Sequence, residues 1–173
     1  KAGAIFDLTK LEWVNSQHLS NLSIDEFKQH LEPFLSKIDI DIENHSNVNL
    51  LINSMRSSEN TLEGIAKSLI PYYKDELDYD TKAISKFCSD NSTILDDIKD
   101  LLLNIDNWTE DDLDNALKSY QTEKNLPVPK VNQPIRIALT GSTKSPSLGL
   151  TLSIFGKELS IKRIDDLITH LNK

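Results

Sequence analysis

The sequence predicts an all-α protein, and three observations support this prediction. Glycine is scarce, at 5 of 173 residues, apolar residues recur at helical rather than alternating spacing, and polar capping residues mark several helix starts. Since roughly 100–200 residues make one domain, the chain is long enough for one substantial core or two small ones.

Three helix starts are explicit in the sequence. A capping side chain stands three residues before a carboxylic acid in the segments 23–26, 60–63 and 109–112. Such an acid can reach back to the free amides of the first turn, and its charge favours the positive end of the helix dipole. A helix is therefore predicted to begin in each segment.

Apolar stripes at i, i+3, i+4 and i+7 follow along the chain, and their default role is to form the core. Gly156 is expected to end the helix before the last stripe. The stripes consist of Leu11, Val14 and His18; Phe27, Leu31, Phe34 and Leu35; Leu62, Ile65, Ala66, Leu69 and Ile70; Ile94, Leu95, Ile98, Leu101, Leu102 and Ile105; and Ile161, Ile164, Leu167, Ile168 and Leu171.

Two segments interrupt the helical pattern. Residues 36–48 alternate apolar and polar and are expected to form an extended connector with no packed face of its own. Residues 124–134 contain three prolines and are expected to run extended. A short helix over residues 135–140 should follow, with Pro134 at its head and Gly141 after it.

Three side chains are expected to pack rather than to act chemically. Cys88 is the single cysteine, so it forms no internal disulfide or CxxC site, and without an adjoining basic cluster it is expected to be a buried hydrophobe. Trp13 is expected to anchor the first apolar face. Trp108, one residue before a capping Thr, is expected to make a staple or core contact.

The net charge of −8 argues against binding nucleic acid, but the charge is unevenly distributed. Residues 1–121 carry a net charge of −12 and residues 122–173 a net charge of +4, while the stretch 74–114 alone holds 13 acids and 4 bases. The repulsion is therefore local, and the C-terminal segment is positive.

No catalytic constellation is recognisable. Residues 141–145 resemble a phosphate-binding loop only superficially, because that loop needs two glycines five apart, followed by Lys and Ser or Thr. The four histidines show no metal-ligand spacing, and the HExxH, GxSxG and GxGxxG motifs are absent. We therefore expect no catalytic residue and no metal site in this chain.

A binding site is better supported. Arg136 lies on a short helix whose apolar residues can be buried, so that its guanidinium can bind a base edge or a phosphate through two hydrogen bonds. The polar loop 140–148 follows, with free backbone donors at a helix entrance, and loops of this kind accept splayed single-stranded bases.

At these residues the chain resembles the C-terminal end of bacterial glutamyl-tRNA synthetases, and the resemblance extends over its whole length. Each short piece is weak alone, but the spaced set is specific. The pieces are the segments 4–7, 10–15, 61–73, 107–109, 133–141, 145–148, 154–158 and 163–164.

The resemblance implies an anticodon-binding α-helix cage of two small helical subdomains, residues 1–76 and 77–173. Synthetases of this family are class I ligases that use ATP and Mg²⁺ in a catalytic domain with HIGH and KMSKS motifs, and neither motif is present here. We therefore expect a fragment that begins just after the catalytic part, which accounts for a start at Lys1, and that needs no cofactor itself.

The family's anticodon-reading residues fall on five positions. By resemblance, Arg136 would contact the exposed bases, Ser145 would bond the middle base and the backbone amide of Leu148 would bond the first. The remaining two readers implied by the resemblance are Gln133 and Pro146.

The family often has an Arg that checks the third anticodon letter. Ungapped alignment on Thr61 and Leu62 puts Ser58 at that position, whereas a slip of two residues brings Arg56 to it. We place Arg56 at the site, and the alternative is an enzyme without the check that also charges tRNA-Gln. The resemblance likewise leaves a position near the tRNA as the alternative for Trp13.

The sequence thus predicts a tRNA anticodon-binding fragment of a cytoplasmic glutamate–tRNA ligase. Its expected partners are the anticodon loop of tRNA-Glu and its own N-terminal catalytic domain, in a monomer without membrane contact. The alternative, favoured only by the acidic surface, is a helical protein-interaction module that binds no RNA.

Overall fold

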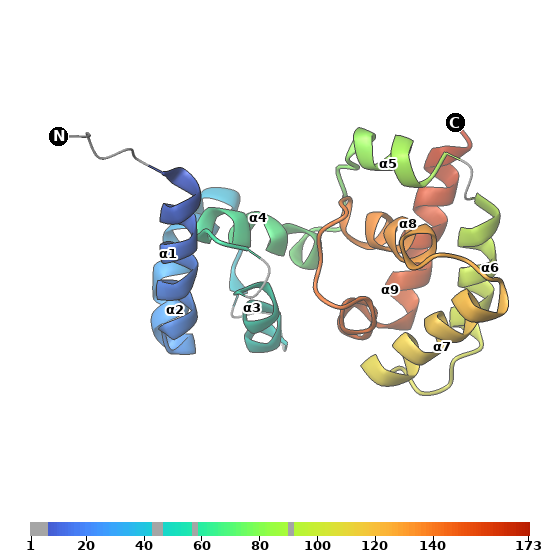
Figure 1. The fold of residues 1–173 in the computed structure, drawn as a ribbon, viewed down its shortest axis with the longest axis horizontal. Coiled ribbons are helices and arrows are strands. Elements are labelled where there is room, and N and C mark those ends of the chain that lie inside the picture. The colour runs from blue at the N-terminus through green and yellow to red at the C-terminus, as the bar shows by residue number, and fades with distance from the viewer. Residues whose placement is uncertain (1–6, 43–46, 57–58, 90–91) are drawn as a thin grey trace. The chain divides into compact units, whose positions relative to one another are not determined.

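The computed structural model describes residues 7–42, 47–56, 59–89 and 92–173, apart from the side chain of Ser92, and divides the chain into two compact units (Figure 1). All regular secondary structure in these residues is helical, which confirms the predicted fold class. The units are Lys1–Tyr73 and Lys74–Lys173. The division into binding subdomains at residues 76 and 77 stays a prediction.

The first unit is built around α2 and α4, which pack against each other and bury Phe27, Leu31 and Leu69 completely. Its elements are α1 (Leu8–Asn21), α2 (Ile24–Leu35), the short 3-10 helix η1 (Ser36–Ile38), α3 (Val48–Arg56) and α4 (Leu62–Tyr73).

The predicted cap of α2 is present, and the cap of α4 lies one residue later than predicted. The side chain of Glu26 accepts from the backbone N–H of Ser23 at 3.0 Å, while Ser23 Oγ accepts from the N–H of Glu26 at 3.3 Å. Hydrogen bonds from Ser23 lower the pKa of Glu26. At the start of α4 the capping hydroxyl belongs to Thr61, which accepts from Gly64 N–H at 3.0 Å, one residue later than the pattern indicated.

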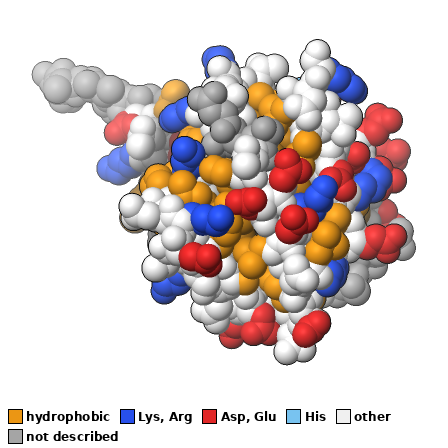
Figure 2. All heavy atoms as spheres, turned by 90° about the vertical axis from the view of Figure 1, so that its right-hand side faces the viewer, with side chains coloured by type: hydrophobic (Ala, Val, Ile, Leu, Met, Phe, Trp, Pro, Cys, Tyr) orange, Lys and Arg blue, Asp and Glu red, His pale blue; other side chains and the backbone are white. Residues whose placement is uncertain are grey.

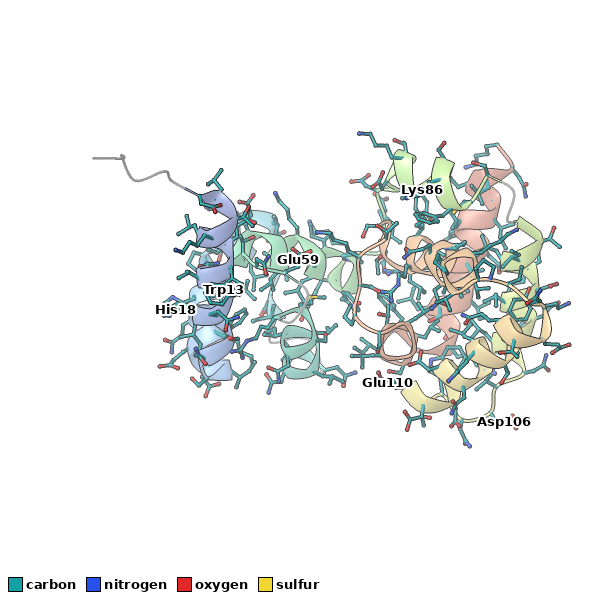
Figure 3. All side chains as sticks on the ribbon, in the orientation of Figure 1. Trp13, His18, Glu59, Lys86, Asp106 and Glu110 are labelled. Atoms are coloured by element: carbon teal, nitrogen blue, oxygen red, sulfur yellow. The ribbon has the colours of Figure 1, made fainter. Side chains whose placement is uncertain are left out.

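The predicted core face of α1 is wrong. Leu11 and Val14 are about half exposed, Trp13 is 61% exposed, and Leu19 is the buried residue of this helix (Figure 3). The core that forms between α2, α3 and α4 leaves α1 to make only a few contacts with α3. Trp13 is therefore not a core anchor within the described residues, and its position near a tRNA stays a prediction.

The connector after α2 is also packed, contrary to expectation. Ile40 and Ile42 are 6% and 3% exposed, and the N–H of Ile40 donates to the carbonyl of Leu35 at 3.2 Å. The alternating isoleucines thus enter the core instead of running over the surface. Residues 43–46 of the expected connector lie outside the described residues, and helix α3 begins within it, at Val48.

The second unit is built around α9, which packs against α6, α7 and α8 (Figure 1). Gly156, with φ 74° and ψ 168°, interrupts α9 and confirms the expected helix stop. The unit's elements are α5 (Thr81–Phe87), α6 (Ser92–Leu103), α7 (Glu110–Glu123), α8 (Val128–Thr140) and α9 (Leu148–Leu171).

The proline-rich segment is helical from Val128, which corrects the prediction of an extended run and a helix starting at residue 135. Pro127 is the N-cap and Pro129 is the second helical residue, where the missing N–H has no helical partner to lose. Pro134 costs about 3 kcal/mol inside a helix. Complete burial of Val131 and Ile135, at about 1.5–3 kcal/mol each, offsets that cost.

The smaller predictions for this unit are confirmed. Cys88 is 2% exposed, and burial raises the pKa of its thiol to about 11. Trp108 packs on the core and donates from Nε1 to the carbonyl of Leu152 at 2.9 Å. Thr109 caps α7 by accepting from the N–H of Asp112 at 3.2 Å.

In the part of the chain described, no helix is both long and apolar enough to span a membrane.

Candidate nucleic-acid interface

Three of the predicted site residues meet at the loop between α8 and α9. Arg136 Nη1 donates to the carbonyls of Ser145 and Pro146, at 2.8 and 2.7 Å, and also contacts Ser145 Oγ. A charged donor shared by two carbonyls fixes the loop backbone more firmly than neutral hydrogen bonds would. The half-buried Arg136 therefore stabilises the loop conformation through its hydrogen bonds, in addition to lying next to the loop.

A second hydroxyl, which sequence reasoning missed, supports this loop. Thr151 is completely buried, and its Oγ1 donates to the carbonyl of Ser147 at 2.9 Å and lies 3.3 Å from Ser145 Oγ. The available signal was a polar residue one turn into an otherwise apolar helix start. Ser145 is thus bound from both α8 and α9.

The start of α9 places Leu148 at the first helical position. Its side chain is 3% exposed and belongs to the core, while its N–H is one that no helical carbonyl can accept. Two acids of α7 bind the neighbouring groups. Glu110, labelled in Figure 3, accepts from Ser147 Oγ at 2.5 Å, and Asp114 accepts from the N–H of Gly149 at 2.8 Å.

Gln133 lies one helical turn before Arg136 on the same side of α8. Its Oε1 is buried, and no described residue donates a hydrogen bond to it. A buried acceptor without a partner costs about 1–3 kcal/mol, which a donor on a bound ligand would recover. Among the predicted site residues that the structure describes, Gln133 is the one with a buried side-chain polar atom that has no partner.

Gly141 joins α8 to the loop at a position where a residue with a side chain would not fit. Its φ of 75° is left-handed, and a Cβ added there would lie 2.3 Å from the carbonyl oxygen of Asp78. The carbonyl of Gly141 accepts from the N–H of Asp80 at 2.8 Å. The segment before α5 thereby fixes the end of α8.

Arg163, which sequence reasoning did not select, also binds the C-terminal end of α8. Only 3% exposed, it donates to the carbonyl of Leu139 at 2.5 Å and to that of Lys74 at 3.0 Å, and its guanidinium carbon lies 4.3 Å from the centre of the Phe155 ring. A charged residue within an apolar stripe was the signal for a buried structural Arg.

Arg56 belongs to the first unit and is engaged in structure. Its Nη2 donates to the carbonyls of Leu19, Ser20 and Leu22, at 2.6, 2.9 and 2.8 Å, so that it caps the C-terminal end of α1. Its guanidinium carbon lies 4.7 Å from the centre of the Phe27 ring. The reading of the third letter by Arg56 stays a prediction, and Ser58 lies outside the described residues.

Folding mixes the charges that are separated along the sequence. Lys99 pairs with Asp165 at 2.8 Å, and Lys124 lies 3.7 Å from Asp97. Figure 2 shows acidic and basic side chains interspersed over one face. Each unit carries a net charge of −4, so the positive segment 122–173 does not make its unit positive.

Among the described residues, no group of three His, Cys, Asp or Glu could hold a metal ion.

The structure resembles parts of larger solved proteins. A glutamate tRNA ligase from Elizabethkingia meningosepticum, crystallised in complex with its amino acid, matches 99% of this chain with 34% of its own, at a TM-score of 0.78 and 23% identity. Glutamate-tRNA synthetase from Elizabethkingia anophelis matches with a TM-score of 0.73 and 21% identity, over 97% of this chain and 33% of its own. At this level of identity the likeness shows the fold.

Sequence comparison extends the likeness. The glutamate–tRNA ligase of Myxococcus xanthus is 32% identical over 95% of this chain and 35% of its own length, and that of Syntrophotalea carbinolica is 28% identical over 100% and 37%. The chain thus spans about a third of the length of these curated relatives. The family model described as anticodon binding domain matches residues 26–168, and the chain therefore belongs to the family of anticodon-binding domains.

Proposed function

We propose that the chain binds the anticodon loop of tRNA-Glu as the C-terminal part of a glutamate–tRNA ligase. The observation that carries this proposal is the joining of Arg136, Ser145 and Pro146 into one fixed loop within the anticodon-binding family match. The curated relatives support it over the alternative of a protein-interaction module, because they are glutamate–tRNA ligases matched along almost the whole chain.

The groups at this loop divide the task of binding bases. Gln133 Oε1, a buried acceptor, would receive a hydrogen bond from a base that carries an amino or imino donor. The N–H of Leu148 would donate to a base or phosphate oxygen. Arg136 keeps the Ser145 hydroxyl and the loop in place, so that a splayed base meets a prepared surface instead of ordering it.

The catalytic steps belong to the tethered part of such an enzyme. That part would use ATP and Mg²⁺ to activate glutamate and transfer it to the tRNA, in the cytoplasm and as a monomer. The present chain contributes binding energy and orientation, which promote the reaction only while the two parts are linked. Arg56 would check the third letter, and without that check the enzyme would also charge tRNA-Gln.

The proposal is tested by binding a glutamate anticodon stem-loop to the wild-type chain and to Arg136→Ala and Arg136→Lys. Loss of a readout Arg costs about 1–3 kcal/mol, and Arg136→Ala also releases the loop, so its Kd should rise at least tenfold. Arg136→Lys keeps the charge but not the planar fork, and should recover only part of the affinity. A stem-loop with a substituted anticodon is the control.

Unchanged affinity for Arg136→Ala would remove Arg136 from the site. If the wild-type chain bound the cognate and substituted stem-loops equally, or bound neither, anticodon recognition by this chain would be rejected. The ratio of tRNA-Glu to tRNA-Gln charging, measured in the full-length enzyme with Arg56→Ala, tests the third-letter role separately.

A further inference from the structure

A groove of about 360 Å³ lies between the C-terminal end of α5 and the start of α8. Lys86 and Phe87 line it from α5, and Pro129 and Lys130 line it from α8. Phe87 is partly buried and packs against the core, and Lys86 Nζ lies 5.0 Å from the centre of its ring. Lys86 is labelled on α5 in Figure 3. The groove therefore offers a fixed aromatic surface beside two ammonium groups.

The charge of this groove is opposite to that of the surrounding sequence. Helix α5 contains two lysines and no acid, although the stretch 74–114 holds 13 acids. Among the residues that the structure describes, no acid lines the groove, and neither Lys86 nor Lys130 forms an ion pair with another described residue. Two exposed ammonium groups are thus available to an anionic ligand.

The groove and the candidate anticodon site lie along the same side of α8. Pro129, Gln133 and Arg136 are spaced i, i+4 and i+7, so they lie along one side of the helix, while Val131 and Ile135 lie in the core. Seven residues of helix span about 10 Å, a distance that adjoining nucleotides of a single-stranded loop can bridge. One RNA strand can therefore occupy both places.

We propose that this groove binds a nucleotide that adjoins the anticodon, with its base stacked on Phe87 and its phosphate between Lys86 and Lys130. The combination of an aromatic face with basic side chains is the one used for single-stranded nucleic acid. The contact of Lys86 with the ring is an exposed cation–π pair, weaker than base stacking, so an incoming base can displace it. This inference rests on the proposed function.

The test compares wild-type chain with Lys86→Gln/Lys130→Gln, Phe87→Leu and the control Lys118→Gln, which removes an exposed lysine of α7 outside the groove. The Kd for the cognate anticodon stem-loop is measured at several salt concentrations. The double variant should weaken binding roughly tenfold and lower the salt slope by about 0.7, since the one phosphate bound between the two lysines contributes about 0.7 on a single strand. Lys118→Gln should change neither.

Phe87→Leu should weaken binding roughly tenfold without changing the salt slope. Because Phe87 also packs on the core, its melting temperature is measured, and a stem-loop with one abasic nucleotide beside the anticodon provides a second test. Removing that base should weaken binding to the wild-type chain but cause no further loss in Phe87→Leu.

If the double variant bound like Lys118→Gln, and abasic substitutions on both flanks weakened wild type and Phe87→Leu equally, the groove would not be an RNA site. The anticodon proposal would still stand if Arg136→Ala weakened binding. Direct binding of an acidic peptide that is lost in the double variant, without an effect of the variant on RNA binding, would assign the groove to a protein partner and overturn the inference.

Discussion

At the scale of single residues, Arg136 combines two roles. It stabilises the loop between α8 and α9, and it is a proposed contact for the RNA bases. A guanidinium has five donors in a fixed plane, and here Nη1 serves the Ser145 and Pro146 carbonyls. The sequence pattern placed Arg136 near the loop correctly. The pattern did not predict that the side chain would bind the loop's own backbone, because such contacts depend on the path of the chain.

Gln133 provides a prediction that separates binding from stability. Its buried Oε1 has no donor among the described residues, so Gln133→Met, which preserves much of the shape, should raise the free energy of unfolding by about 1 kcal/mol. The same change removes the acceptor for a base and should weaken stem-loop binding. Chemical denaturation and a binding titration measure the two effects. A Gln133→Met variant that was less stable than wild type and bound the stem-loop with unchanged affinity would contradict this role.

Cys88 provides a prediction about pH. With a pKa of about 11, roughly 1 thiol in 1,000 is ionised at pH 8, so labelling by a thiol reagent should be slow until the chain unfolds. Because the folded pKa is raised above the ordinary value of 9.0, the contribution to stability is complete below pH 9 and is lost as the pH rises toward 11. Rapid labelling at pH 8 under native conditions would show that the thiol is accessible.

At the scale of elements, the fate of each predicted segment follows from how much of its information is local. Helix starts depend on neighbouring residues, and those at Ser23 and Thr109 formed as predicted. The prolines before residue 135 were misleading because local rules weigh a missing N–H, whereas the burial of Val131 and Ile135 depends on helices distant in sequence.

The same distinction explains the two errors in the first unit. A stripe such as Leu11 and Val14 shows that a helix has an apolar face, but it does not show whether another element covers that face. Ile40 and Ile42 lie in a segment with no helical period, yet the end of α2 directs them into the core. Periodicity identifies elements, and long-range packing decides their neighbours.

The junction of α8 with its loop gives a prediction with a matched control. Gly141→Ala places a methyl group 2.3 Å from a backbone oxygen at a left-handed φ, whereas Gly156→Ala puts its methyl group in open space, at a φ of 74° and a ψ of 168° that also favour glycine. Backbone strain alone costs about 1–3 kcal/mol at either position, and Gly141→Ala adds a clash with the backbone, so it should destabilise the chain by a larger amount. Equal losses in urea denaturation would show that the segment at Asp78 can move aside without cost.

At the scale of the whole molecule, charge limits how RNA is bound. Both units carry a net charge of −4, and ion pairs such as Lys99–Asp165 use part of the positive charge that the C-terminal sequence supplies. A protein of this kind repels RNA at long range, and its selectivity must come from short-range contacts at a few places. The basic groove at Lys86 and Lys130 and the loop at Arg136 are the two places proposed for such contacts.

The salt dependence of binding follows from the small number of phosphate contacts. One phosphate contact in the groove, at a slope of about 0.7, predicts that a rise from about 50 to 200 mM salt weakens cognate binding by about two- to threefold, whereas 6–10 contacts at the same slope would weaken it by roughly 300- to 16,000-fold. A non-cognate stem-loop should bind weakly at either salt concentration, because the acidic surface provides little electrostatic attraction for its phosphates. A steep cognate slope, together with tight binding of non-cognate RNA at low salt, would mean that phosphate attraction and not base contact supplies the affinity.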